Sequence, residues 1–165
     1  MILISVVKKS VTLCLMAMGI MVPHLSQSQH SSPDTLIHAA VKLNDTLLQD
    51  SLSLYLTSEG SLADARELIR MAGGQYYRIS PLFSFWGMMI QYGKNISFTG
   101  LGYRIGFCNC QEVTMVPPAT SIFIGSDSVH FAPLGFLSSA IGGSVVYNNS
   151  TNQLIITVDP PHEFG

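Results

Sequence analysis

Two glycine pairs, Gly73–Gly74 and Gly142–Gly143, mark the points at which helices can end in this chain. Each pair follows a short stretch with apolar residues at helical spacing and precedes a stretch with strand-like alternation. The first glycine allows a left-handed helix end, and the second lets that end pack closely on a strand, because no β-carbon intervenes. The pairs therefore predict helices over residues 61–71, with Ser61 as N-cap, and 133–141.

Glycine and proline divide the remaining sequence into short apolar-polar alternations of the kind that form antiparallel strands. The stretch 35–44 is compatible with a short helix or a strand. The second predicted helix carries its apolar face on Phe136, Leu137, Ala140 and Ile141, which we expect to rest on residues 154–158. Strands are predicted over residues 47–57, 76–79, 85–92, 95–99, 103–108, 111–116, 121–124, 144–147 and 153–158.

The chain also contains an internal repeat. Shifting the sequence by 69 residues aligns the two glycine pairs and lays Leu62 on Phe131, Ala63 on Ala132 and Leu68 on Leu137. Each copy then reads helix, Gly-Gly, strand, turn, strand. The sequence predicts an α+β fold of short antiparallel strands with two short helices in a pseudo-repeat.

Residues 1–28 have the three parts of a secretory signal peptide. Lys8 and Lys9 precede an apolar run at 11–22, which is too short to span a bilayer, and Ser26 and Ser28 form a small-residue cleavage site. The alternative is an amphipathic or membrane-anchoring N-terminal helix. We expect export to the periplasm or cell envelope of a bacterium.

Lipid attachment and nucleic-acid binding are both disfavoured by the sequence. Leu13 occupies the position before Cys14 where a lipoprotein acceptor needs a small residue. The chain has 8 Lys and Arg against 10 Asp and Glu, and no basic cluster is available to neutralise a phosphate backbone. At 11% charged residues, the surface must be mostly neutral and polar.

Cys108 and Cys110 are separated by Asn109 alone. A disulfide across one residue is strained, so the alternatives are two thiols or a soft-metal site that adds a ligand such as His130. The simplest interpretation is two strand cysteines that point the same way, and their oxidation state is left open. Because no histidine pair has ligand spacing, we expect neither a metal nor another cofactor.

The second copy resembles the copper amine oxidase N-terminal-like domain. That family has V-P-L-R-F, an alanine-rich helix, a glycine, V-x-W, an Asp/Asn-rich turn and a strand. The first copy resembles the weaker half repeat before the catalytic domain of exported, spirochaete-type cell-wall amidases. Three residues depart from the pattern: Gly135 replaces the arginine, Ala132 the valine, and Arg78 an aromatic residue. The matching residues are Phe131, Pro133, Leu134, Phe136, Leu137, Ala140, Gly142, Gly143, Val145, Tyr147, Asn148, Asn149, Thr151 and the stretch 154–158.

The resemblance implies a non-catalytic envelope module that contacts peptidoglycan or another envelope protein. Together with the signal-peptide pattern, it divides the chain into a signal peptide at 1–28, a polar lead with a short element at 29–46, the domain at 47–158 and a tail at 159–165. The structural positions that it implies are Gly73, Gly74, Pro133, Phe136, Leu137, Gly142, Gly143 and Tyr147.

The C-terminal sequence offers an enzyme alternative. Residues 156–162 read I-T-V-D-P-P-H, which is similar to the strand and D-P-G-H-G-G with which zinc-dependent N-acetylmuramoyl-L-alanine amidases open their catalytic domain. Pro161 replaces a glycine, and a catalytic zinc needs three protein ligands, for which His162 alone is present here. The alternative is therefore the N-terminal accessory part of an amidase without its zinc domain.

An aromatic stretch supplies the candidate binding residues Tyr76, Tyr77, Trp86 and Tyr92, with Phe83 and Phe85 between them. Such side chains can stack on the rings of a glycan. At strand spacing they are also typical of core residues, and both interpretations stay open.

Overall fold

The computed structural model describes residues 34–79 and 86–159. The predicted signal peptide, most of the polar lead, Phe83, Phe85 and the histidine of the amidase-like tail lie outside these residues. In the described part of the chain, neither helix has the length and apolar character that crossing a bilayer requires.

A seven-stranded sheet contains both ends of the described chain. Its strand order is β11-β12-β1-β2-β3-β10-β9, and every neighbouring pair is antiparallel except β1 and β12, which run parallel. The strands are β1 Thr35–Leu43, β2 Thr46–Thr57, β3 Gly60–Asp64, β9 Thr120–Ile124, β10 Asp127–Pro133, β11 Ser144–Asn148 and β12 Gln153–Thr157.

A five-stranded antiparallel meander forms the second sheet, in the order β4-β5-β6-β7-β8. Its strands follow one another along the chain, as the alternation and the intervening glycines predict. They are β4 Gln75–Ile79, β5 Gly87–Tyr92, β6 Asn95–Gly100, β7 Ile105–Cys108 and β8 Gln111–Thr114.

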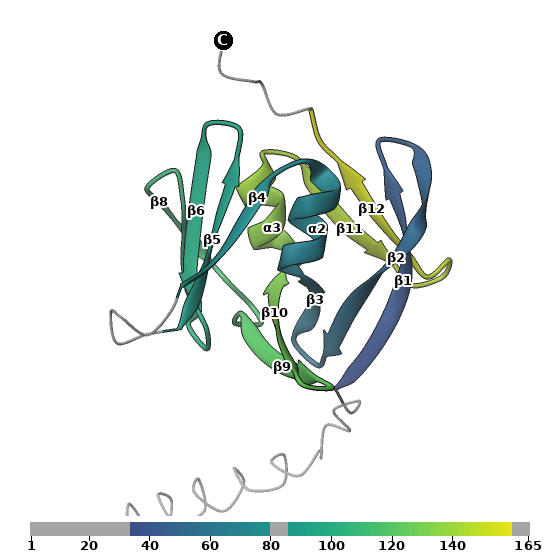
Figure 1. Cartoon of the computed structure of the whole chain (residues 1–165), viewed down its shortest axis with the longest axis horizontal. Helices are drawn as coiled ribbons and strands as arrows, with labels where there is room; N and C mark the ends of the chain where they lie inside the picture. The colour runs from purple at the N-terminus through teal and green to yellow at the C-terminus, as the bar shows by residue number, and fades with distance from the viewer. Residues whose placement is uncertain (1–33, 80–85, 160–165) are drawn as a thin grey trace, which may run out of the picture. The chain divides into compact units, whose positions relative to one another are not determined.

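Two helices, α2 Ala65–Ala72 and α3 Leu134–Ile141, lie between the sheets and contact each other (Figure 1). The predicted α+β fold with two short helices is confirmed. The buried face of α3 consists of the four predicted residues, Phe136, Leu137, Ala140 and Ile141. They belong to the same buried core as Leu154, Ile156 and Val158, and α3 also lies close to β10, β11 and β5–β7.

Both helices end at the predicted glycine pairs. Gly73 and Gly142 have φ values of 88° and 66°, and the following glycine donates its N–H to the carbonyl five residues earlier in each case. A β-carbon on Gly74 would lie 2.9 Å from the Gln91 carbonyl oxygen, and one on Gly143 would lie 2.2 Å from that of Thr157. The second glycine is therefore required by the strand beside it, as the sequence predicts.

The start of the first helix was predicted wrongly. Residues 60–64 form β3, and the N-cap is Asp64, whose carboxylate accepts a hydrogen bond from the Glu67 N–H at 3.1 Å, rather than Ser61. Leu62 and Ala63 fit a helical face in the sequence, but pairing with β2 on one side and β10 on the other satisfies their backbone groups.

Two further strands change the predicted organisation. Residues 35–44, compatible with helix or strand in the sequence, form β1 between β12 and β2. The sheet thus begins at Thr35, within the segment that the resemblance assigned to the lead. The strand β10 was not predicted, because the sequence around Val129 and His130 shows neither a clear strand pattern nor a clear loop pattern.

Cys108 and Cys110 are free and do not share a strand. Cys108 is the buried last residue of β7, whereas Asn109 and Cys110 form the two-residue turn to β8 with φ values of 50° and 64°. The interpretation of two strand cysteines that point the same way is wrong, because a hairpin turn of this type needs positive φ at both central residues.

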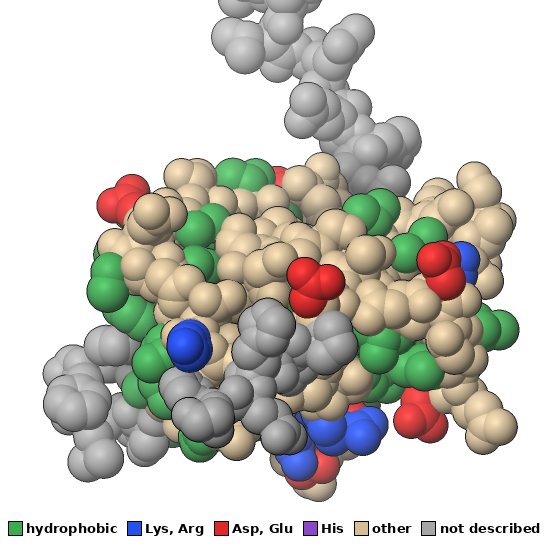
Figure 2. Space-filling model, turned by 90° about the horizontal axis from the view of Figure 1, so that it is seen from above, with side chains coloured by type: hydrophobic (Ala, Val, Ile, Leu, Met, Phe, Trp, Pro, Cys, Tyr) green, Lys and Arg blue, Asp and Glu red, His purple; other side chains and the backbone are tan. Residues whose placement is uncertain are grey.

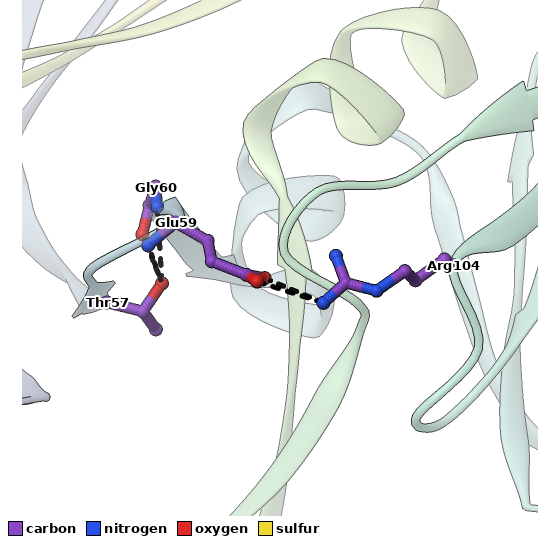
Figure 3. Close-up of polar contacts among 4 residues, drawn as sticks. All are labelled: Thr57, Glu59, Gly60 and Arg104. Atoms are coloured by element: carbon purple, nitrogen blue, oxygen red, sulfur yellow. Dashed lines mark hydrogen bonds and ion pairs between the residues drawn. The ribbon is translucent and has the colours of Figure 1, made fainter. Parts of the chain in front are cut away.

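An ion pair connects the turn before β3 with the loop before β7, and thus the two sheets (Figure 3). One guanidinium nitrogen of Arg104 contacts both carboxylate oxygens of Glu59, at 2.9 and 3.1 Å. The Thr57 hydroxyl accepts hydrogen bonds from the N–H groups of Glu59 and Gly60 and fixes this turn.

We expect Leu137→Ala to lower the free energy of unfolding by about 2 to 5 kcal/mol, because the Leu137 side chain is completely buried and its truncation leaves a cavity in the core. Ser139→Ala, on the exposed face of the same helix, should change it by less than about 1 kcal/mol. Urea denaturation of both variants measures the difference. Equal midpoints would show that the buried face of α3 is misplaced.

Two substitutions at left-handed positions should act in opposite directions. Gly142→Ala adds a β-carbon at φ 66° and should destabilise the fold by about 1 to 2 kcal/mol. Cys110→Gly removes one at φ 64° and should stabilise it by about 0.5 to 1 kcal/mol, with Cys110→Ser as the unchanged control. Thermal unfolding tests both, and a destabilised Cys110→Gly would refute the turn geometry.

Candidate functional site

A groove lies where β4, the edge of the five-stranded sheet, approaches β9 and β10 of the other sheet. It consists of two adjoining cavities of about 790 and 530 Å³. Their shared lining is Arg78 from β4, Phe123 from β9, and Ser128 and His130 from β10. The groove thus combines segments that are about 50 residues apart in the sequence, as the Arg78–Ser128 contact shows.

Strand alternation explains which side chains reach the groove. On β9 and β10, Ser121 pairs with His130 and Phe123 with Ser128, so all four side chains lie on one face. The hydroxyls of Ser121 and Ser128 are 2.5 Å apart. On β4, Tyr76 and Arg78 share the face opposite to Tyr77, and both line the larger cavity.

The Tyr76 hydroxyl and His130 Nδ1 are 2.6 Å apart and join the two sheets across the floor of the groove. His130 is 4% exposed, and burial, assisted by the charge of Arg78, lowers its pKa to about 4. Burial raises the pKa of Tyr76. At neutral pH both groups are therefore uncharged, and we assign the hydroxyl as donor and Nδ1 as acceptor, which leaves the ring proton on Nε2.

Arg78 is held in place without a carboxylate. Its Nη2 donates a hydrogen bond to the backbone carbonyl of Ser128, and no carboxylate of the described residues lies within 4.0 Å of it. The side chain is exposed. By contrast, Arg70 and Arg104 each contact glutamate.

The smaller cavity is lined by exposed aromatic side chains. Trp86, Tyr103 and Phe123 are 54%, 59% and 76% exposed, and they come from the residue before β5, the β6–β7 loop and β9. A soluble domain rarely gathers exposed aromatic rings around a concave surface unless something packs against them. The sequence analysis named Trp86 but missed Tyr103 and Phe123, because no local pattern distinguishes them from core residues.

The larger cavity has a mixed charge. Its described lining adds Asp64, Arg66, Glu67 and Asp127, from the start of α2 and from β10. Burial raises the pKa of Asp64 despite the hydrogen bond from Glu67 N–H, which opposes the shift. The two ends of the groove therefore differ, because one is charged and the other is aromatic.

The structure separates the four predicted binding residues. Tyr76 and Trp86 line the groove. Tyr77 is exposed on the opposite face of β4, where its hydroxyl donates to Gln75 Oε1. Tyr92 is 5% exposed and donates to the Asp159 carbonyl oxygen, so almost none of its ring is available to a ligand.

The remaining predicted structural residues lie around α3. Pro133 is the N-cap of that helix and pairs with Leu62 of β3. Phe136 packs on the inner face of the five-stranded sheet, where a β-carbon on Gly106 would lie 2.7 Å from its ring. Tyr147 packs against the core from β11, and its hydroxyl donates to Asn152 Oδ1 at 3.1 Å.

The outer face of the five-stranded sheet is also apolar. Phe98 and Phe107 stack with ring centroids 5.1 Å apart, and Ile96 and Ile105 are exposed beside them. On the surface seen in Figure 2, charged side chains are few among uncharged ones, and in two places acidic and basic side chains lie beside each other.

Within residues 34–79 and 86–159, no three His, Cys, Asp or Glu side chains come close enough together to hold a metal ion. Searches with this chain against protein-family models, curated proteins and solved structures find no match.

We expect the free energy of unfolding to fall by roughly 2 to 3 kcal/mol as the pH is lowered from 6.5 to about 4. In this range His130 binds a proton in the unfolded chain, whereas burial keeps it unprotonated in the folded protein. Asp64 contributes with the opposite sign, since its raised pKa favours the folded state at acidic pH. His130→Gln keeps an acceptor for Tyr76 and should flatten the pH dependence in urea denaturation.

His38→Gln is the matched control, because His38 is an exposed histidine on β1. It should leave the pH dependence of the wild type unchanged. A slope that is the same in the wild type and in His130→Gln would contradict the assigned protonation of His130.

Proposed function

We propose that this protein is an exported, non-catalytic module that binds the glycan of the bacterial cell wall in the groove between β4 and β9–β10. The observation that carries the proposal is the cavity lined by Trp86, Tyr103 and Phe123, whose rings are more than half exposed. Flat aromatic faces pack on the apolar faces of pyranose rings, and hydroxyls such as Ser121 and Ser128 bind the polar edges.

Export is part of the proposal and is supported by the sequence of residues 1–28, with its lysine pair, short apolar run and small-residue site. The low proportion of charged residues fits a hydroxyl-rich ligand better than nucleic acid. The alternative, an accessory part of an amidase, is supported by the sequence of residues 156–162 and by the resemblance of the first copy to the half repeat of exported amidases.

We further propose that the fold is a pseudo-repeat of two hairpin-helix-hairpin units, of the kind found in the copper amine oxidase N-terminal-like domain. The units are β2-β3-α2-β4-β5 and β9-β10-α3-β11-β12. Ala63 and Ala132, equivalent in the 69-residue shift, are direct partners in the β3–β10 pair. Gly74 and Gly143 lie against the carbonyl groups of Gln91 and Thr157, which are the partners of the next residue in each copy.

The binding proposal is tested by co-sedimentation of the whole chain with purified peptidoglycan. Trp86→Ala should weaken binding about tenfold, because it removes a stacking face worth on the order of 1 to 2 kcal/mol. Tyr77→Ala is the matched control, an exposed tyrosine on the opposite face of β4, and should bind like the wild type.

Binding that Trp86→Ala leaves intact would refute the groove as the site. If the same preparation instead loses binding in Phe98→Ala, the contact lies on the outer face of the five-stranded sheet. Failure of the wild type to sediment with peptidoglycan would refute the proposed function.

A further inference from the structure

We propose that the groove selects sugars that carry a carboxylate, with Arg78 as the anion-binding group and the aromatic cavity as the ring-binding surface. The inference rests on the proposed glycan binding and adds the chemical class of the ligand. It follows from the position of Arg78 among aromatic rings, where no carboxylate of the described residues lies within 4.0 Å of its guanidinium.

The first argument for an anionic ligand is the charge distribution in the smaller cavity. Its described lining is Arg78, Trp86, Leu101, Tyr103, Ser121, Phe123, Ser128 and His130. Arg78 is the one permanently charged group of that lining, since the lowered pKa of the buried His130 leaves its ring uncharged at neutral pH. A ligand in this cavity therefore meets a single positive charge and no negative one, which favours an anion.

The second argument is that the hydrogen bonding of Arg78 leaves its guanidinium able to bind a carboxylate. The backbone carbonyl of Ser128 accepts a hydrogen bond from one terminal nitrogen, and Arg78 forms no ion pair with a carboxylate of the described residues. A guanidinium has five N–H donors in a planar fork that matches a carboxylate. Because the side chain is already anchored to β10, less conformational entropy is lost on binding an anion than for a free arginine.

The third argument is that aromatic rings lie near Arg78, which favours a ligand with both a ring and a carboxylate. Arg78 shares the smaller cavity with Trp86 and Phe123, whereas the acidic residues of the described lining belong to the larger cavity alone, so an anion bound to Arg78 is favoured on the aromatic side. A simple anion would not use the aromatic surface, and a neutral sugar would leave the guanidinium without a partner. A pyranose with a carboxylate substituent uses both. N-acetylmuramic acid belongs to that class where its lactyl carboxylate is free, that is, in glycan from which the amide-bonded stem peptide has been removed.

Two disaccharides with the same backbone test the inference by titration calorimetry on the whole chain. N-acetylglucosaminyl-N-acetylmuramic acid carries the carboxylate, and N,N′-diacetylchitobiose does not. The wild type should bind the first about tenfold or more tightly, as expected for one charge-assisted contact. The preference should decrease as the salt concentration is raised.

Arg78→Gln should abolish the preference, so that both disaccharides bind with the same affinity, and Arg78→Lys should retain part of it. Arg70→Gln is the control, because Arg70 is an exposed arginine on α2 paired with Glu67. If Arg78→Gln does not fold, the role of Arg78 is tested by the salt dependence of the wild-type preference and by the reduced preference of Arg78→Lys.

Equal affinity of the wild type for both disaccharides would overturn the carboxylate inference and leave the proposed glycan binding standing. No binding of either disaccharide, together with no sedimentation with peptidoglycan, would overturn both. A preference that Arg78→Gln leaves intact would assign the carboxylate to another residue and refute the role of Arg78.

Discussion

The antiparallel pairing of β3 with β10 is the contact on which the remaining arrangement depends. Ala63 faces Ala132 across it, and both side chains are completely buried. Each strand continues directly into a helix, so the pairing fixes where α2 and α3 begin. The small side chains at this point let two helices pack against the same region, and larger residues would force them apart.

The groove follows from this arrangement. After α2 the chain passes to β4, and α3 supports β5–β7 through the ring of Phe136 over Gly106. The five-stranded sheet is thereby held with β4 beside β10, close enough for the 2.6 Å contact between Tyr76 and His130. That contact closes the floor beneath Arg78, and the aromatic wall is added by loops and edge strands, where binding residues are commonly found.

Sequence reasoning predicted local structure well where one residue type dictates the backbone. The glycine pairs fixed both helix ends, and alternation located the meander, because these are short-range effects. It failed at β3, where an apolar pattern compatible with a helix is overridden by two strand partners. It also mistook Cys108 and Cys110 for strand neighbours, since the positive φ values at the turn have no signature in Cys-Asn-Cys.

The site was less predictable than the fold, because its residues come together through contacts between the sheets. Trp86 and Tyr76 were named for their aromatic character, but so was Tyr92, which is buried. Arg78 was noted as a departure from an aromatic position, and the structure gives it a place in both cavities. Phe123 and Tyr103 could be assigned to the site only from the structure, because β9 and the β6–β7 loop, from which they come, belong to different sheets.

The most direct test of the account is to map ligand contacts by NMR, following amide and aromatic signals while cell-wall disaccharides are added. The account predicts shifts confined to Tyr76, Arg78, Trp86, Tyr103 and Phe123 and their immediate neighbours. Shifts on Phe98 and Phe107 of the outer sheet face, with none in the groove, would contradict it.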